Sequence, residues 1–163
     1  MQVQGRMIPA GLGELQVSGD PKAVLVAYGL GSCVGVVAYE PVVRVGAILH
    51  AMLPHASASS EGPLTKFVDT GIKFMLKEVE RCGGKRDRLI VKIVGGARML
   101  LSPDFRDIFD IGACNAQMAQ HVLADFGLAL NGTDVGGSQG RTVRLYVATG
   151  KVVVKTLGEE KEL

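Results

Sequence analysis

The sequence lacks the cysteine patterns of a disulfide-stabilised or zinc-binding protein. It contains three cysteines, Cys33, Cys82 and Cys114, an odd number at wide spacings with no Cys-x-x-Cys pair. Such spacing argues against a disulfide framework and against a structural zinc site. We therefore expect no metal and no other cofactor, and we predict a reducing, cytoplasmic location.

An excess of one charge is also missing. The 18 Lys and Arg residues and 16 Asp and Glu residues give a formal net charge of +2. No basic face is implied, so nucleic acid is not an expected partner.

Membrane-directing segments are lacking as well. The first residues have no apolar core of the kind that a signal peptide needs. Residues 23–39 carry no ionised side chain, but this stretch is just short of the usual length of a span and contains the turn signal of residues 29–32. We predict two buried strands around a tight turn, and no insertion into a membrane.

What is present is the composition of a packed globular protein. The chain has 163 residues, of which 47% are hydrophobic and 21% charged. It has no internal repeat, low-complexity block or linker, so residues 1–163 are predicted to form one domain, with a charged tail at about 158–163 that is expected to fray.

The hydrophobic pattern predicts an α+β fold in which helices cover a mixed sheet. Apolar residues at three- and four-residue spacing from Val68 to Val79 predict one helix, and a second is expected over about 112–126. Short apolar or alternating runs predict strands at 14–18, 23–28, 33–39, 45–52, 89–94, 128–130, 142–147 and 151–156.

Cys33 is the most informative residue for function. It follows Gly29-Leu30-Gly31-Ser32 and opens a strand, so we expect it at a sharp turn. Backbone amides freed in such a turn, here those of Ser32 and Cys33, are suited to bind a developing oxyanion. On composition alone, a small buried hydrophobic side chain is the favoured interpretation of this cysteine.

His50 makes a catalytic interpretation stronger. It lies in an otherwise apolar strand, where a polar ring costs free energy unless it is hydrogen-bonded. If the strands of Cys33 and His50 are antiparallel neighbours, the imidazole is close enough to take the thiol proton. A core histidine bound to a backbone carbonyl remains the alternative.

Other candidates have weaker support. Cys114 is expected in the first turn of the second helix with no histidine near it, and Asn115 beside it resembles a capping or turn residue. Cys82 is expected at a helix end where the dipole disfavours a thiolate. His55 and His121 are expected to be ordinary solvated side chains.

The glycine pairs 95–96 and 136–137 are not phosphate loops, because no Gly-Lys-Ser/Thr follows them. Turn geometry is their favoured interpretation. Arg141 is expected at a solvated strand end, although it could orient a polar group of a partner.

Together these residues resemble the CheD family of chemotaxis proteins, the chemoreceptor glutamine deamidases. The pairing of Gly-Leu-Gly-Ser-Cys with His-x-Met-Leu-Pro at this spacing is the most specific part. The matching stretches follow the family order and span nearly the whole chain: residues 29–34, 50–54, 69–70, 92–97, 111–115, and 136–137 with Arg141.

The resemblance implies a cysteine hydrolase that converts selected receptor glutamines to glutamates. It implies a layered, α/β/α-like sandwich related to bacterial toxins that deamidate host proteins. The family cysteine falls on Cys33 and its histidine on His50. Expected partners are the cytoplasmic domains of chemoreceptors as substrate and a CheC-type phosphatase.

One departure from the family pattern concerns the position of a third catalytic member. The family often has a threonine six residues before the cysteine, where this chain has Ala27, which has no side-chain hydrogen-bond acceptor. Either a backbone carbonyl or another side chain orients His50, or turnover is reduced. A second departure is Cys114, where arginine is more common in the family.

Two alternatives to deamidation therefore stay open. One is a regulatory module that binds a CheC-type phosphatase with weak or no catalysis. The other is hydrolysis of glutamyl methyl esters, which differs only in the leaving group.

Overall fold

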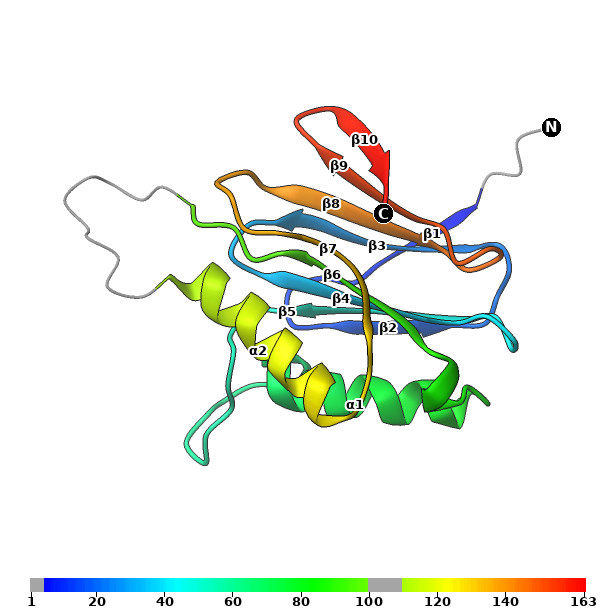
Figure 1. Ribbon diagram of the computed structural model, residues 1–163, viewed down its shortest axis with the longest axis horizontal. Helices are drawn as coiled ribbons and strands as arrows, with labels where there is room; N and C mark the ends of the chain where they lie inside the picture. The colour runs from blue at the N-terminus through cyan, green and yellow to red at the C-terminus, as the bar shows by residue number, and fades with distance from the viewer. Residues whose placement is uncertain (1–4, 100–109) are drawn as a thin grey trace.

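In a computed structural model that describes residues 5–99 and 110–163, the chain forms two stacked five-stranded sheets and two helices (Figure 1). Residues 1–4, which belong to the segment expected to lack a signal peptide, lie outside the described residues.

Both sheets are mixed. The pairs β1–β3 and β6–β7 are parallel and the other neighbours are antiparallel. The first sheet has the order β1 (Arg6–Pro9), β3 (Ala23–Leu30), β8 (Arg141–Tyr146), β9 (Val152–Thr156), β10 (Glu159–Glu162). The second has the order β2 (Leu15–Ser18), β5 (Val45–Ala51), β4 (Val34–Glu40), β6 (Ile90–Gly95), β7 (Leu130–Val135).

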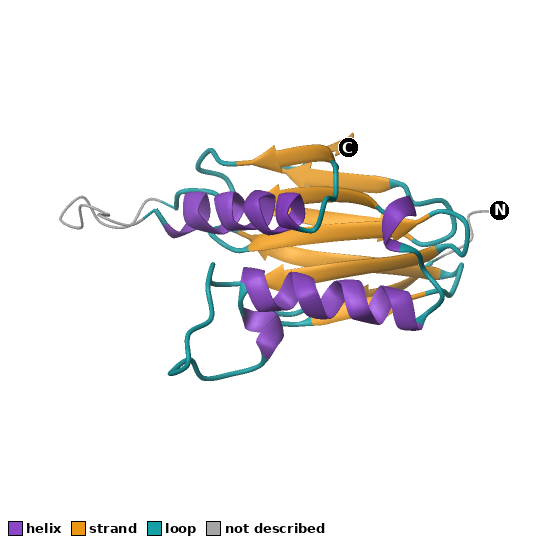
Figure 2. Cartoon of the chain, turned by 60° about the horizontal axis from the view of Figure 1, so that its bottom comes forward, coloured by secondary structure: helices purple, strands orange, loops and turns teal. Residues whose placement is uncertain are grey.

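The helices α1 (Val68–Arg81) and α2 (Ile111–Asp125) both cover the outer face of the second sheet, as Figure 2 shows. Two short 3₁₀ turns, η1 (Leu64–Lys66) and η2 (Arg86–Arg88), precede α1 and β6. The predicted α+β class with helices on a mixed sheet is therefore confirmed.

Side-chain alternation along β4 and β5 divides the interior into two clusters. Val36 and Leu49 point toward the helices, whereas Val37 and Ile48 point toward the first sheet. The layer order is thus helix, sheet, sheet. It differs from the α/β/α-like sandwich that the resemblance implied, because the apolar faces of β3, β8 and β9 cover the side of the second sheet that a further helical layer would occupy.

The apolar stretch 23–39 forms two strands around a turn, as predicted. The strands do not pair with each other, because the turn carries the chain from β3 in the first sheet to β4 in the second. Among the described residues, no helix is long and apolar enough to cross a membrane.

Three strands differ from the sequence-based expectation. The hydrophobic pattern gave no indication of β1. The sequence predicted a strand that ends at Leu130, whereas β7 begins there; the prediction stopped early because residues 131–134 have the composition of a turn. The tail that we expected to fray forms β10, paired with β9. Ion pairs from Lys161 to Asp134 (3.1 Å) and from Arg144 to Glu160 (3.2 Å) hold it, and Leu163 packs on the core.

Glu40 is a fully buried carboxylate at the end of β4. It accepts hydrogen bonds from Arg88 Nη2 (2.7 Å) and from the backbone N–H groups of Val42 (2.7 Å) and Lys85 (3.2 Å). The hydrogen bond from Arg88 lowers the pKa of this carboxyl to about 2, and the two backbone donors add to the effect. Glu40 thereby ties the β4–β5 turn to the segment before β6.

Glu40→Gln is expected to lower the free energy of unfolding at neutral pH by about 2 kcal/mol, because Arg88 loses its charged partner and the buried donors lose a carboxylate. The folded pKa lies below the ordinary value of 4.5, so this stabilisation is present above that pH and is lost as the pH falls to about 2. Urea denaturation over this pH range measures both effects.

The control is Glu80→Gln, which removes the partially exposed pair with Arg86 and should change stability by less than about 0.5 kcal/mol. A Glu40→Gln penalty that does not shrink toward acid pH would contradict the assignment.

Candidate active site

His50 lies near the end of β5 and is only 2% exposed. The connection from β1 to β2 holds it at three points. Its Nδ1 lies 3.0 Å from the carbonyl oxygen of Ala10, its backbone N–H donates to Glu14 (2.9 Å), and its carbonyl accepts from Gly13 (2.9 Å). Position and ring orientation of the imidazole are therefore both fixed.

The contact with Ala10 determines which ring nitrogen carries the proton. A carbonyl oxygen only accepts, so Nδ1 must be the donor. In the neutral ring Nε2 then has a free lone pair, and it has no hydrogen-bond partner among the described residues. This is the tautomer that a general base needs.

Cys33 lies immediately before β4 on the same side of the second sheet as His50. Gly35 pairs directly with His50 in the antiparallel β4–β5 ladder, and Cys33 precedes Gly35 by two residues. The half-buried Cys33 side chain packs against the cluster between the sheets, whereas Val34 points toward the helices. Cys33 is thus the diagonal neighbour of His50, a position within reach of a long side chain, and Gly35 has no side chain between them.

Glycines hold the turn that carries Cys33. Gly96 N–H donates to the Cys33 carbonyl and Ala97 N–H to the Gly31 carbonyl, both at 2.8 Å. Gly95, with a φ of 106°, lies so close to the Cys33 carbonyl that a Cβ there would collide with it. The turn interpretation of this glycine pair is therefore confirmed.

Burial raises the pKa of the Cys33 thiol, and the residue's own backbone N–H opposes this effect only in part. The resting side chain is a neutral thiol. A nucleophilic role for Cys33 therefore requires a base.

Ala27 lies in β3 with its methyl group fully buried between the sheets. Its neighbour Val26 accepts a hydrogen bond from the N–H of Ala10 at 2.8 Å. The carbonyl of Ala10, rather than a side chain at position 27, orients His50 in this chain. Of the two kinds of orienting group that the sequence left open, a backbone carbonyl and another side chain, the structure shows the backbone carbonyl.

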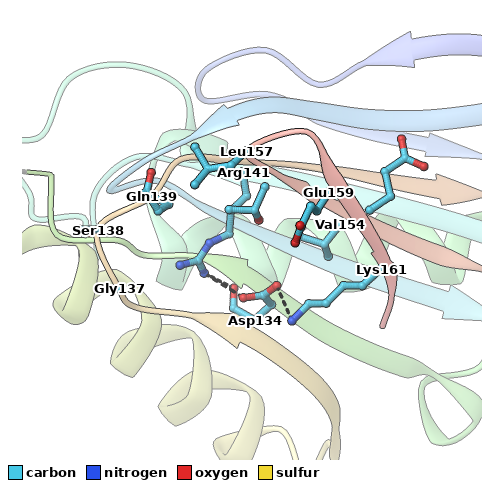
Figure 3. A pocket seen from close by; sticks show the side chains of 11 residues that line it. Asp134, Gly137, Ser138, Gln139, Arg141, Val154, Leu157, Glu159 and Lys161 are labelled. Atoms are coloured by element: carbon cyan, nitrogen blue, oxygen red, sulfur yellow. Dashed lines mark hydrogen bonds and ion pairs between the residues drawn. The ribbon is translucent and has the colours of Figure 1, made fainter.

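Arg141 is 7% exposed, so its expectation as a solvated strand end is wrong. Its Nη1 donates to the Gly95 carbonyl at 3.2 Å and lies 3.3 Å from the carboxylate of Asp134, and further bonds reach the carbonyls of Asp134 and Gly136. Figure 3 shows Arg141 and Lys161 converging on Asp134. These residues line a cavity of about 510 Å³. Arg141 thus links the glycine pair 95–96, which contacts Cys33, to the pair 136–137.

The interpretation of Asn115 as a capping or turn residue is wrong, because Asp110 caps α2 and Asn115 lies inside the helix. It is fully buried in α2, and its Nδ2 donates to the carbonyls of Ser32 (2.8 Å) and Met52 (3.0 Å). The signal was available, because Asn115 lies four residues before Ala119 and seven before Val122 on the apolar face of the helix, where a polar residue is exceptional.

The other candidates lie apart from the Cys33–His50 region. The thiols of Cys82 and Cys114 are exposed at the end of α1 and the start of α2. His55 pairs with Asp69 (2.8 Å) and His121 with Asp125 (3.3 Å), each histidine with a largely exposed side chain. Within residues 5–99 and 110–163, no group of three His, Cys, Asp or Glu side chains is arranged to hold a metal ion.

Comparison with known proteins identifies the family. A family model described as CheD chemotactic sensory transduction matches residues 52–156. A probable chemoreceptor glutamine deamidase CheD of Symbiobacterium thermophilum is 45% identical over 161 residues, covering 97% of this chain and 98% of the relative. The chain belongs to the CheD family.

Other matches extend over similar lengths or less. The chemoreceptor glutamine deamidase CheD of Thermotoga maritima is 39% identical and covers 94% of both chains. Among solved structures, the hypothetical protein YfiH of Bacillus licheniformis superposes with a TM-score of 0.43 and 16% sequence identity. The superposition covers 76% of this chain and 49% of that protein. The family model begins after Cys33 and His50, whereas the CheD relatives cover both positions.

The Ala10 contact predicts the tautomer of the neutral His50 ring in this CheD-family chain. In a ¹⁵N-edited NMR spectrum near neutral pH, the neutral His50 ring should show a protonated Nδ1 and an unprotonated Nε2, because only Nδ1 faces an acceptor. His121 serves as the exposed reference. A ring protonated at Nε2 would contradict the assignment.

Burial of Cys33 raises its pKa, so its thiolate should form at a higher pH in the folded protein than in the unfolded chain. The rate of its reaction with iodoacetamide, followed by peptide mass spectrometry, should reach half its maximum at a higher pH in the folded protein than in protein unfolded by urea. The unfolded chain provides the reference for the same residue. A profile shifted to lower pH on folding would show a preformed thiolate instead.

Proposed function

We propose that this chain deamidates glutamine side chains of chemoreceptors, with Cys33 as nucleophile and His50 as general base. The observation that carries the proposal is the imidazole whose Nδ1 is bound to Ala10 and whose Nε2 is free, on the strand next to Cys33 and on the same face. The names of the CheD relatives support the substrate and the reaction.

The first half of the reaction forms a thioester. Nε2 of His50 takes the proton from Sγ of Cys33, and the sulfur attacks the side-chain carbonyl carbon of the glutamine. The electron pair of the C=O bond moves to oxygen, which the N–H groups of Ser32 and Cys33 bind. Neither group donates to a backbone carbonyl of the described residues. When the C–N bond breaks, His50 returns its proton to the nitrogen and ammonia leaves.

The second half restores the enzyme. His50 takes a proton from water, and the resulting hydroxide attacks the thioester carbonyl. The C–S bond then breaks, the sulfur recovers its proton from His50, and glutamate is released. The raised pKa of Cys33 fits this scheme, because a neutral thiol makes the base necessary.

The proposed partners and location follow from this function. The substrate is the cytoplasmic part of a chemoreceptor, and the protein acts in the cytoplasm, where three free thiols remain reduced. We also propose a CheC-type phosphatase as regulatory partner. The His50 ring, bound to Ala10 at Nδ1 and free at Nε2, favours hydrolysis over a purely regulatory role, since a binding module needs no oriented base.

The test is incubation of a purified receptor cytoplasmic fragment with the protein, followed by mass spectrometry of Gln-to-Glu conversion. Cys33→Ala should abolish conversion, and His50→Ala should slow it by about 100-fold or more, the usual contribution of a general base. Fragments carrying glutamyl methyl esters, assayed in parallel, measure the balance between deamidation and ester hydrolysis.

Cys82→Ala is the matched control and should leave the rate unchanged, because this exposed thiol lies at the far end of α1. Conversion that persists in Cys33→Ala would remove Cys33 from the mechanism. A wild-type protein that binds the receptor or the phosphatase without converting any glutamine would favour the regulatory module.

A further inference from the structure

Asn115 connects the two segments that carry the candidate nucleophile and base. Ser32 precedes Cys33, and Met52 lies two residues after His50. The two hydrogens of the Asn115 amide are used on these two carbonyls, and Oδ1 is buried without a partner among the described residues. A buried unpaired oxygen costs about 1–3 kcal/mol, so this position is not explained by stability alone.

Small residues bring the helix close enough for this bridge. Gly112, one turn before Asn115, packs directly on the backbone of Gly96 and Ala97, and a Cβ on Gly112 would overlap the carbonyls of both residues. Gly96 in turn donates to the carbonyl of Cys33. The start of α2 is thus held against the same turn that its asparagine contacts.

The bond to Ser32 acts on the peptide group that joins Ser32 to Cys33. Because this unit is planar and trans, its C=O and N–H point in opposite directions. Asn115 binds the C=O of Ser32, so the N–H of Cys33 points away from Asn115. A hydrogen bond at the carbonyl also polarises the N–H and makes it a better donor.

We propose that Asn115 is a positioning residue that aims the Ser32–Cys33 peptide N–H at the developing oxyanion and keeps the ends of β4 and β5 in register. The inference rests on the proposed deamidation. Asn115 touches neither substrate nor reacting atom, and acts through the Ser32 and Met52 carbonyls. Because the oxyanion exists only after attack, removing Asn115 should lower kcat rather than raise KM.

The decisive variant is Asn115→Asp, which keeps the size of the side chain but replaces the NH₂ donor with an oxygen. Asn115→Ala is the second variant, in case the carboxylate prevents folding. In the receptor assay each folded variant should lose about 100-fold in kcat, the order expected for misplaced catalytic groups, with KM within about twofold of wild type. Loss of rate through KM alone, or kcat within about threefold of wild type, would overturn the proposal.

The control is Asn131→Ala. Asn131 also bonds to the main chain, accepting from the N–H of Val91 at 2.9 Å, but at the opposite end of β6 from the Cys33 turn. The Asn131→Ala substitution should leave kcat unchanged at temperatures where the variant is folded. If Asn131→Ala lowers kcat as much as Asn115→Ala, Asn115 is merely structural.

A second readout separates failure of this proposal from failure of the proposed function. Acetylation of Cys33 by p-nitrophenyl acetate, read by nitrophenol release and by peptide mass, requires no receptor. Asn115→Asp should slow it in the wild-type background but have little further effect in His50→Ala, because the two act on one step. If no receptor glutamine is converted but Asn115→Asp slows acetylation only when His50 is present, the positioning role stands without deamidation. If the rate losses of Asn115→Asp and His50→Ala are additive, or if acetylation of the wild-type protein does not depend on His50, the positioning role is overturned.

Discussion

The hydrogen bond from His50 Nδ1 to the carbonyl of Ala10 determines how the rest of the site can act. It joins β5 of the second sheet to the segment leaving β1 of the first, and it leaves Nε2 as the basic nitrogen. The same segment also binds the N–H and the carbonyl of His50. Ring and backbone are therefore anchored together, which is the preorganisation that a proton transfer needs.

Burial has different consequences for the polar groups of this molecule. Glu40 is buried and fully hydrogen-bonded, which favours its charged form and makes it part of the scaffold. Cys33 is half-buried with little to stabilise a thiolate, so burial favours its neutral form. Four buried side-chain polar atoms have no hydrogen-bond partner among the described residues: His50 Nε2 and Asn115 Oδ1 belong to the site, whereas the Nε atoms of Arg88 and Arg144 lie outside it.

The layered fold explains why residues distant in sequence meet. Two glycine loops, at the ends of β6 and β7, lie beside the turn of Cys33, and buried Arg141 holds both through their carbonyls. α2 covers the same end of the second sheet and adds Asn115. The turn thus accepts hydrogen bonds from two separate parts of the chain, the segment after β6 and α2. Gly95 and Gly96 have positive φ values and lie where a Cβ would collide with the neighbouring backbone.

Sequence patterns were sufficient to predict elements whose residues carry a clear hydrophobic period or turn signal. Periodicity located both helices and most strands within a few residues. The glycine-rich turn before Cys33, together with a histidine in an apolar strand, singled out the two candidate catalytic residues. The patterns did not predict elements whose conformation depends on contacts with residues far away in the chain. The tail Glu159–Glu162 reads as disordered because its charges find partners only on β7 and β8. Residues 131–134 read as a turn because pairing with β6, not local preference, keeps them extended.

The sequence by itself determined the α+β class, the CheD resemblance and the identity of Cys33 and His50, because these depend on residue type, spacing and periodicity. Only the tertiary structure decided that a second sheet covers the first, that the carbonyl of Ala10 contacts Nδ1 of His50, and that Asn115 and Arg141 are buried. Each of these depends on a backbone carbonyl or a packed face far away in the chain. A carbonyl is present at every residue, so no sequence pattern indicates which one will accept a given hydrogen bond.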